Sequence, residues 1–146
     1  MGTPFSDIYH AAASKFVDYD FLRLSDRAKE QIMHAYMISA EKDFAPHCLV
    51  DLSRDENNES YIETLDSEII EILACGIAFY WLSARVLNTE NLRNKISSKD
   101  ISYYSPANLL REMISLRDAA GKEFREKIVR YSYDHGDIAG LRVRDS

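Results

Sequence analysis

Apolar residues recur at helical spacing in four stretches of the sequence, and polar segments separate them. The first stretch, residues 6–16, is short and alanine-rich, with Ser6 placed to cap its first turn. The second covers residues 25–44, starting at a serine that can act as a cap. Pro46 ends it, because the proline ring disfavours helical geometry at the preceding residue. The pattern therefore predicts two helices in the first third of the chain.

The third stretch, residues 66–87, is apolar around most of the helical circumference, with Asp66 as its expected cap. A helix of this kind is covered on more than one side, and a neighbouring subunit is one source of that cover. Glu71 and Arg85 interrupt the apolar run, and charges are costly at the centre of a bilayer. We therefore expect a buried core helix and no membrane span.

A polar segment, residues 88–104, is interpreted as a linker to the fourth stretch. Ser105 and Pro106 are a strong helix start, because serine caps and proline is favoured at the first helical position. The helical pattern continues to Tyr133, which predicts a helix of about 28 residues and about 42 Å. That length exceeds what a small four-helix protein requires, so we expect the helix to reach a partner.

Residues 134–146 follow the last helix and contain too few apolar residues to form a core of their own. Leu141 to Arg144 alternate apolar and basic side chains, as an extended strand does. A frayed terminus and a strand that joins the sheet of a partner both fit this pattern. Residues 53–60 are polar throughout and are interpreted as a solvated loop.

The predicted fold is all-α, a small helical bundle with a long C-terminal helix and an extended C-terminal tail. We divide the chain into a helical domain, residues 1–133, and the tail, residues 134–146. A length of 146 residues fits one domain of this kind. Because Cys48 and Cys75 have no metal-binding or redox spacing, we expect synthesis in a reducing cytoplasm. The first residues carry no secretory pattern.

The formal net charge is −6, with 24 acidic and 18 basic residues scattered along the chain. Proteins that bind DNA tightly cluster lysine and arginine against the phosphates. The charge pattern therefore argues against sequence-specific DNA binding. It is compatible with a surface past which DNA moves without adhering.

The motifs that mark common enzymes are missing from the sequence. The four histidines lie in four separate segments, and there is no HExxH, no GxxxxGK and no GxSxG. Acidic pairs are frequent, but in a chain with 24 acids they are usually solvated surface groups. We therefore expect no enzyme activity, no cofactor and no metal.

The second half of the chain, residues 65–141, resembles a group of small virion proteins encoded by tailed bacteriophages. The blocks Tyr104–Leu110 (YSPANLL) and Tyr131–Tyr133 (YSY) carry the resemblance most specifically. It implies a head–tail connector, or adaptor: a helical protein that forms a ring, usually a dodecamer, beneath the portal in the virion neck. Its partners would be the portal protein, the next neck protein (a stopper or tail-completion protein) and further copies of itself. Genomic DNA would pass through the channel without sequence-specific binding.

In related adaptors a C-terminal segment docks into the portal. By this resemblance the portal-binding residues are Tyr131, Tyr133, Ile138, Leu141, Arg142, Val143 and Arg144. The turn at residues 134–136 departs from the family pattern, where a more basic sequence is expected. The third and fourth helices supply the candidates for contact between subunits, which are Phe79, Trp81, Leu109, Met113, Leu116 and Phe124.

Two other function classes stay open. A small regulator would bind DNA through a helix-turn-helix with residues 25–44 as its recognition helix. Such a helix needs a basic face, which Arg27, Lys29 and Lys42 do not make. A generic helical dimer without a ring is the other alternative. Oligomer mass and salt-dependent DNA binding distinguish the three classes.

Overall fold

A computed structural model describes the backbone over residues 2–15, 24–95 and 106–137, and side chains over 2–15, 24–88 and 110–135. The described chain is mostly helical, so the predicted all-α class is confirmed. Its four α-helices are α1 (Phe5–Ala13), α3 (Asp26–Phe44), α4 (Ser67–Lys95) and α6 (Pro106–Tyr131). The shorter elements are η1 (Ala45–His47), η2 (Ser132–Asp137), β1 (Thr3–Pro4), β2 (Arg54–Asp55) and β3 (Ser60–Tyr61).

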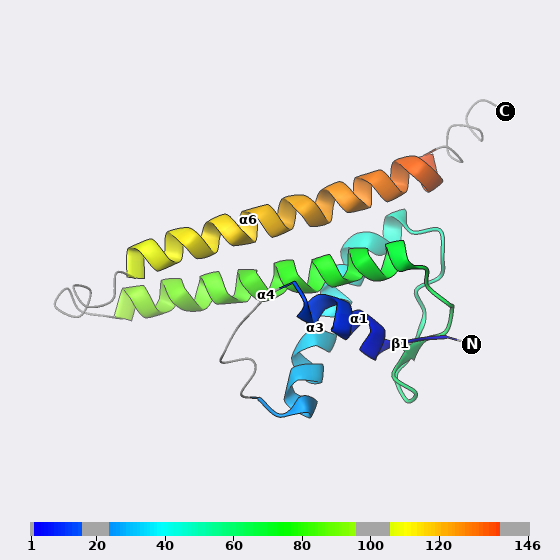
Figure 1. Cartoon of the computed structure of the whole chain (residues 1–146), viewed down its shortest axis with the longest axis horizontal. Helices are drawn as coiled ribbons and strands as arrows, with labels where there is room; N and C mark the ends of the chain where they lie inside the picture. Colours follow the sequence, from blue (N-terminus) through cyan, green and yellow to red (C-terminus); the bar gives the residue numbers. More distant parts are fainter. Residues whose placement is uncertain (1, 16–23, 96–105, 138–146) are drawn as a thin grey trace.

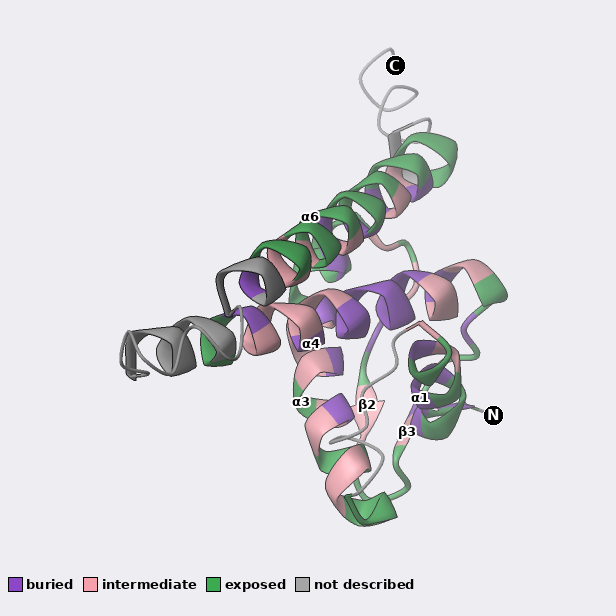
Figure 2. Cartoon of the chain, turned by 60° about the vertical axis from the view of Figure 1, so that its left-hand side comes forward, coloured by how far each residue is buried: buried purple, intermediate pink, exposed green. Residues whose placement is uncertain are grey.

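Helix α4 lies between two layers. Helix α6 runs antiparallel along one side of it, and α1 and α3 pack against the opposite side (Figure 1). This arrangement explains why α4 is apolar around most of its circumference: its first half is covered by three other helices of the same chain. Figure 2 shows the consequence for α6, whose outer face is exposed while its inner face is buried.

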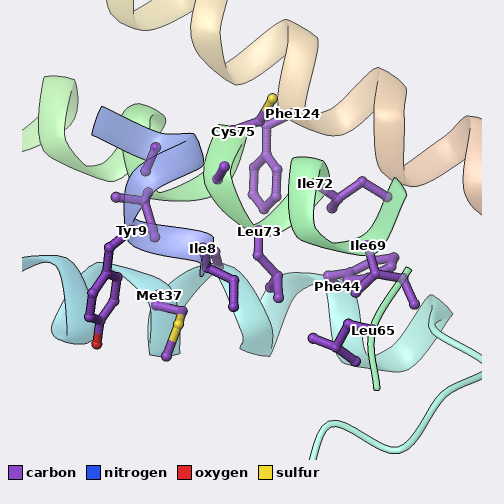
Figure 3. Close-up of a cluster of buried hydrophobic side chains, with 14 of the residues drawn as sticks. Ile8, Tyr9, Met37, Phe44, Leu65, Ile69, Ile72, Leu73, Cys75 and Phe124 are labelled. Carbon is purple, nitrogen blue, oxygen red and sulfur yellow. The ribbon is translucent and has the colours of Figure 1, made fainter. Parts of the chain in front are cut away.

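The core forms where α1 and α3 meet the first half of α4. Figure 3 shows Ile8 of α1, Met37 and Phe44 of α3, and Leu73 of α4 converging there. All four side chains are fully buried. Burial of such a side chain stabilises the fold by roughly 1.5–3 kcal/mol. The apolar face predicted for α3 ran through Ala28, Ile32, Tyr36, Ala40 and Phe44 and was widened by Met33 and Met37. Its second half is confirmed, because Met33, Met37, Ala40 and Phe44 are buried, whereas Ala28, Ile32 and Tyr36 are half-buried.

Two glycines allow α4 to approach its neighbours closely. A Cβ atom on Gly76 would overlap the Cβ of Ala40 in α3 and lie 2.9 Å from the ring of Phe124 in α6. On α6, a Cβ on Gly121 would lie 2.8 Å from the ring of Phe79. The close spacing of α3, α4 and α6 therefore depends on the missing side chains.

The helix starts follow local chemistry. The Ser25 hydroxyl accepts a hydrogen bond from the Ala28 amide (3.2 Å), and Asp66 accepts one from the Ile69 amide (2.9 Å). These two predicted caps are confirmed. Helix α3 ends at Phe44 as expected, but Ala45 keeps helical dihedral angles (φ −51°, ψ −39°) and begins η1, so the predicted reason, that Pro46 disfavours helical geometry at Ala45, is wrong. The predicted Ser6 cap is wrong: α1 begins one residue earlier, without a side-chain cap.

The predicted loop at residues 53–60 is wrong in part. Strands β2 and β3 form a hairpin there, and β1 adds to it in the antiparallel order β1-β3-β2. The Phe5 amide donates to the Glu59 carbonyl (2.9 Å), and the Leu65 amide donates to the Thr3 hydroxyl (2.7 Å). Short polar strands lack a hydrophobic alternation, so the sequence pattern did not reveal this pairing.

The predicted linker at residues 88–104 is also shorter than expected. Helix α4 continues to Lys95 and reaches 29 residues, about 43 Å at 1.5 Å per residue. Lysine, arginine and glutamate are good helix formers, so a polar helix end needs no core to remain helical. Helices α4 and α6 therefore form a long hairpin that extends beyond α1 and α3 (Figure 1).

By length and composition alone, one segment of α4, Ser67–Asn88, is apolar enough to cross a membrane. Its most apolar window is 56% buried inside the fold. Packing against α1, α3 and α6 accounts for this apolar character, as in the core helix of a globular protein.

Candidate interaction surfaces and polar clusters

The end of α6 is anchored in the core by Tyr131. Its side chain is 3% exposed, its ring meets Phe44 edge-on at 5.1 Å between centroids, and its hydroxyl accepts a hydrogen bond from the Leu49 amide (3.3 Å). The prediction that Tyr131 contacts the portal does not fit this position, because the side chain is enclosed by its own chain. It is instead the residue that fixes where α6 ends.

Tyr133 and His135 lie on η2, just beyond that anchor. Tyr133 is 68% exposed and can meet a partner. His135 packs its ring on Tyr131 at 4.6 Å between centroids, and its Nε2 lies 2.9 Å from a carboxylate oxygen of Glu68 at the start of α4. Residue 135 of η2 thus lies beside the first turn of α4. The remaining predicted portal contacts, Ile138, Leu141, Arg142, Val143 and Arg144, lie outside the described residues.

The six predicted subunit contacts fall into different environments. Phe124 and Trp81 are 3% and 8% exposed and belong to the core of their own chain, which does not fit direct contact with another subunit. Phe79 and Met113 are half-buried. Leu116 is 55% exposed and free for such a contact. The side chain of Leu109 lies outside the described residues.

Several large apolar side chains are exposed outside the core. Two of them, Leu87 and Leu116, lie on the half of the α4–α6 hairpin that projects beyond α1 and α3, with 57% and 55% of their surface exposed. Scattered exposed apolar residues are common in monomers. Their position on a projecting hairpin makes these two the better candidates for an interface. The others are Leu24, Leu49, Ile62, Val129 and Tyr133.

An apolar groove of about 400 Å³ runs between the end of α3, α4 and α6. Phe79, Phe124 and Ile128 form its apolar part, and Val129, which is 65% exposed, stands at its edge. The charged and polar residues of its rim are Asp43, His47 and Arg125. The sequence did not predict this groove, because its lining comes from four separate elements, α3, η1, α4 and α6.

A chain of polar contacts links α1, α3 and the β2–β3 hairpin. The Tyr9 hydroxyl lies 3.1 Å from His34 Nδ1, and His34 Nε2 lies 3.0 Å from Glu56. Glu56 also accepts a hydrogen bond from Arg54 (2.9 Å), whose guanidinium pairs with Glu41. Every contact is satisfied when His34 donates from Nε2 and accepts from the tyrosine at Nδ1.

This network adjoins an open pocket of about 440 Å³. The pocket is lined by Phe5, Tyr9, Asp26, Arg27, Glu30, Gln31, His34, Glu56 and Glu59. Burial raises the pKa of Tyr9 and also that of Tyr61, a fully buried residue whose hydroxyl has no hydrogen-bond partner in the described part of the chain. Tyrosines with raised pKa values stay protonated at neutral pH and do not act as bases. The network therefore suits fastening α1 and the hairpin to α3 better than proton transfer.

A second cluster contains the one group of potential metal ligands found among the described residues. Glu71 and Cys75 on α4 and Glu123 on α6 place their ligand atoms within 4.8 Å of one another. Burial raises the pKa of the Cys75 thiol to about 12, so the thiol carries its proton at neutral pH. The Lys15 ammonium already pairs with Glu71. These features favour a charge cluster that joins α1, α4 and α6.

Sequence reasoning had one signal for this cluster, the spacing of Glu71 and Cys75 by four residues on one helix. Lys15 and Glu123 come from distant parts of the chain, and only the packing of α1 and α6 on α4 brings them together. The network around His34 had no sequence signal, because its members are spread over residues 9–56.

Comparison of the chain with protein-family models, with curated proteins and with solved structures gave no match.

Proposed function

We propose that this chain is a structural virion protein: a head–tail connector, or adaptor, that forms a ring under the portal of a tailed bacteriophage. In this role it extends the DNA channel and links the capsid vertex to the next neck protein. The proposal rests on the resemblance carried by YSPANLL and YSY. Its main structural support is the long α4–α6 hairpin.

The hairpin is suited to contact between copies. Helices of 29 and 26 residues exceed what the core around α1 and α3 covers, and Leu87 and Leu116 are exposed along them. A ring requires a head-to-tail interface in which two different faces of one chain meet. A projecting helical hairpin supplies two such faces, one on each helix.

The electrostatics agree with a channel for DNA. Acidic residues exceed basic residues by six. An acidic lining weakly repels phosphates and keeps DNA from adhering. The exposed Tyr133 and the segment after it remain the proposed contact with the portal. Tyr131 is left out of this contact because it is buried.

The first test is cryo-electron microscopy of purified virions of the phage that encodes this chain. We expect a ring of its density directly below the portal, with residues after Tyr133 entering the portal. Intact virions without the chain would refute the proposal. The mass of the purified protein adds a second test, since a stable dimer with no larger assembly on the portal supports the generic dimer instead.

A further inference from the structure

We propose that residues 138–146 of the chain occupy the apolar groove between α3, α4 and α6 of the same molecule. The inference concerns the isolated protein and does not depend on the phage assignment. Its basis is the groove itself, the composition of the segment, and the point at which the described chain ends.

The groove has the properties of a docking site for a short apolar segment. Its apolar surface is formed by the buried side chains of Phe124 and Ile128 and by the half-buried side chain of Phe79. Val129 is 65% exposed at the edge, although it directly follows the core residue Ile128. Apolar surface of this kind gains free energy when another apolar group covers it.

The sequence of the segment, IAGLRVRDS, matches such a groove. In extended geometry, Leu141 and Val143 project from one side, and Arg142 and Arg144 project from the other. The apolar side can enter the groove while the arginines stay at the rim. The segment ends with Asp145, so it carries charges of both signs.

The rim of the groove also carries charges of both signs. Asp43 lies there and accepts a hydrogen bond from Tyr80, which holds the carboxylate in place. Arg125 is the basic residue of the rim. Asp43 can therefore pair with an arginine of the segment, and Arg125 can pair with Asp145. Exposed pairs of this kind contribute little energy and mainly select the orientation.

The groove lies close enough to the end of the described chain for residues 138–146 to reach it. Val129 and Asp137 are eight residues apart on continuous helical turns, about 12 Å. Nine extended residues span up to about 30 Å, which leaves enough length for the required reversal of direction. Gly140 allows a tight turn at that reversal, because it has no Cβ atom.

Tethering favours the same molecule over a second copy. A segment held by a short connection has an effective concentration in the millimolar range, well above that of another chain in dilute solution. A docked segment would cover Leu141 and Val143 in the free protein. A partner that binds the segment would then have to displace it from the groove.

The test compares full-length proteins by NMR, with the methyl groups of Ile128 and Val129 observed in dilute solution. In Leu141→Asp/Val143→Asp we expect both methyl signals to shift, because charged side chains cannot fill an apolar groove. Ser115→Asp is the matched control, since it adds a charge to an exposed position of α6 outside the groove. Identical Ile128 and Val129 signals in wild type and the double variant would overturn the proposal.

A synthetic peptide, IAGLRVRDS, provides the second measurement. It should restore the wild-type signals of the double variant in a saturable way, whereas a scrambled peptide should not. It should bind wild type at least about tenfold more weakly, because the tethered segment competes for the groove. A wild-type signal that changes on dilution would place the segment on a second copy and would also overturn the proposal.

Discussion

At the scale of single residues, this fold depends on glycines at helix contacts and on a few polar groups that hold segments together. Gly76 is the clearest case, because it faces both α3 and α6. Tyr131 combines both roles, since its ring packs on Phe44 and its hydroxyl binds the Leu49 amide. The sequence does not show the close packing at Gly76 or the contacts of Tyr131. From the sequence alone, a glycine within a helix is expected only to destabilise it.

Replacement of Gly76 by alanine should lower the free energy of unfolding. The new Cβ overlaps Ala40 and crowds Phe124, and overpacking of this kind costs about 1–3 kcal/mol. The gain in helix propensity, up to about 1 kcal/mol, offsets only part of this cost. Urea denaturation measures the difference. Asn88→Ala, at an exposed position of the same helix, should be neutral or slightly stabilising; equal stability of Gly76→Ala and wild type would contradict the packing argument.

Because of the ion pair between Lys15 and Glu71, the free energy of unfolding should decrease at low pH. The hydrogen bond from Lys15 holds the pKa of Glu71 below its usual range, although burial acts in the opposite direction. A lowered folded-state pKa gives stability that is present above the ordinary glutamate pKa, about 4.3, and is lost as pH falls through the lower folded value.

Glu71→Gln should therefore have a lower free energy of unfolding than wild type at pH 7. This difference between the two proteins should become smaller below about pH 4. Urea denaturation over a pH series measures both effects. Glu126→Gln is the control, because that carboxylate lies at the surface and 3.9 Å from Lys122. A difference that stays constant with pH would show that the ion pair does not set the pKa of Glu71.

At the scale of elements, the α4–α6 hairpin has a buried half and a projecting half. The buried half packs against α1 and α3, so its apolar residues are needed for folding. The projecting half carries Leu87 and Leu116, which the fold leaves exposed. This division separates substitutions that affect stability from those that affect assembly.

The element-scale prediction is that Leu116→Asp leaves the fold intact and weakens assembly. A charge at a residue that is 55% exposed costs the monomer little, but it is unfavourable in an apolar interface. Circular dichroism should stay unchanged, while native mass spectrometry should show loss of oligomers. Ser115→Asp, at a neighbouring exposed position, is the control. Unchanged oligomers in Leu116→Asp would remove this residue from the interface.

At the scale of the whole molecule, α4 organises the protein. It contacts α1 and α3 on one side and α6 on the other, so the four α-helices of the described residues share one core (Figure 1). The projecting hairpin, the exposed Tyr133 and the acidic surplus remain available for partners. The proposed ring uses these features without rearranging the core.

The sequence alone determined the helical class, the Ser25 and Asp66 caps, the end of α3 and the start of α6. These features are local, because caps and prolines act on the residues beside them. The polar end of α4 and the small sheet were not predicted, because neither has the apolar periodicity that indicates a helix or a strand.

Only the tertiary structure decided which side chains became core and which remained surface. Phe124 and Tyr131 share a helical pattern with Leu116, yet the first two are buried and the third is exposed. The difference arises because α1, α3 and η1 gather around one half of the α4–α6 hairpin. The groove and the charge cluster at Cys75 likewise combine residues that are distant in the chain. Periodicity gives a helix its apolar face, but packing determines how much of that face is covered.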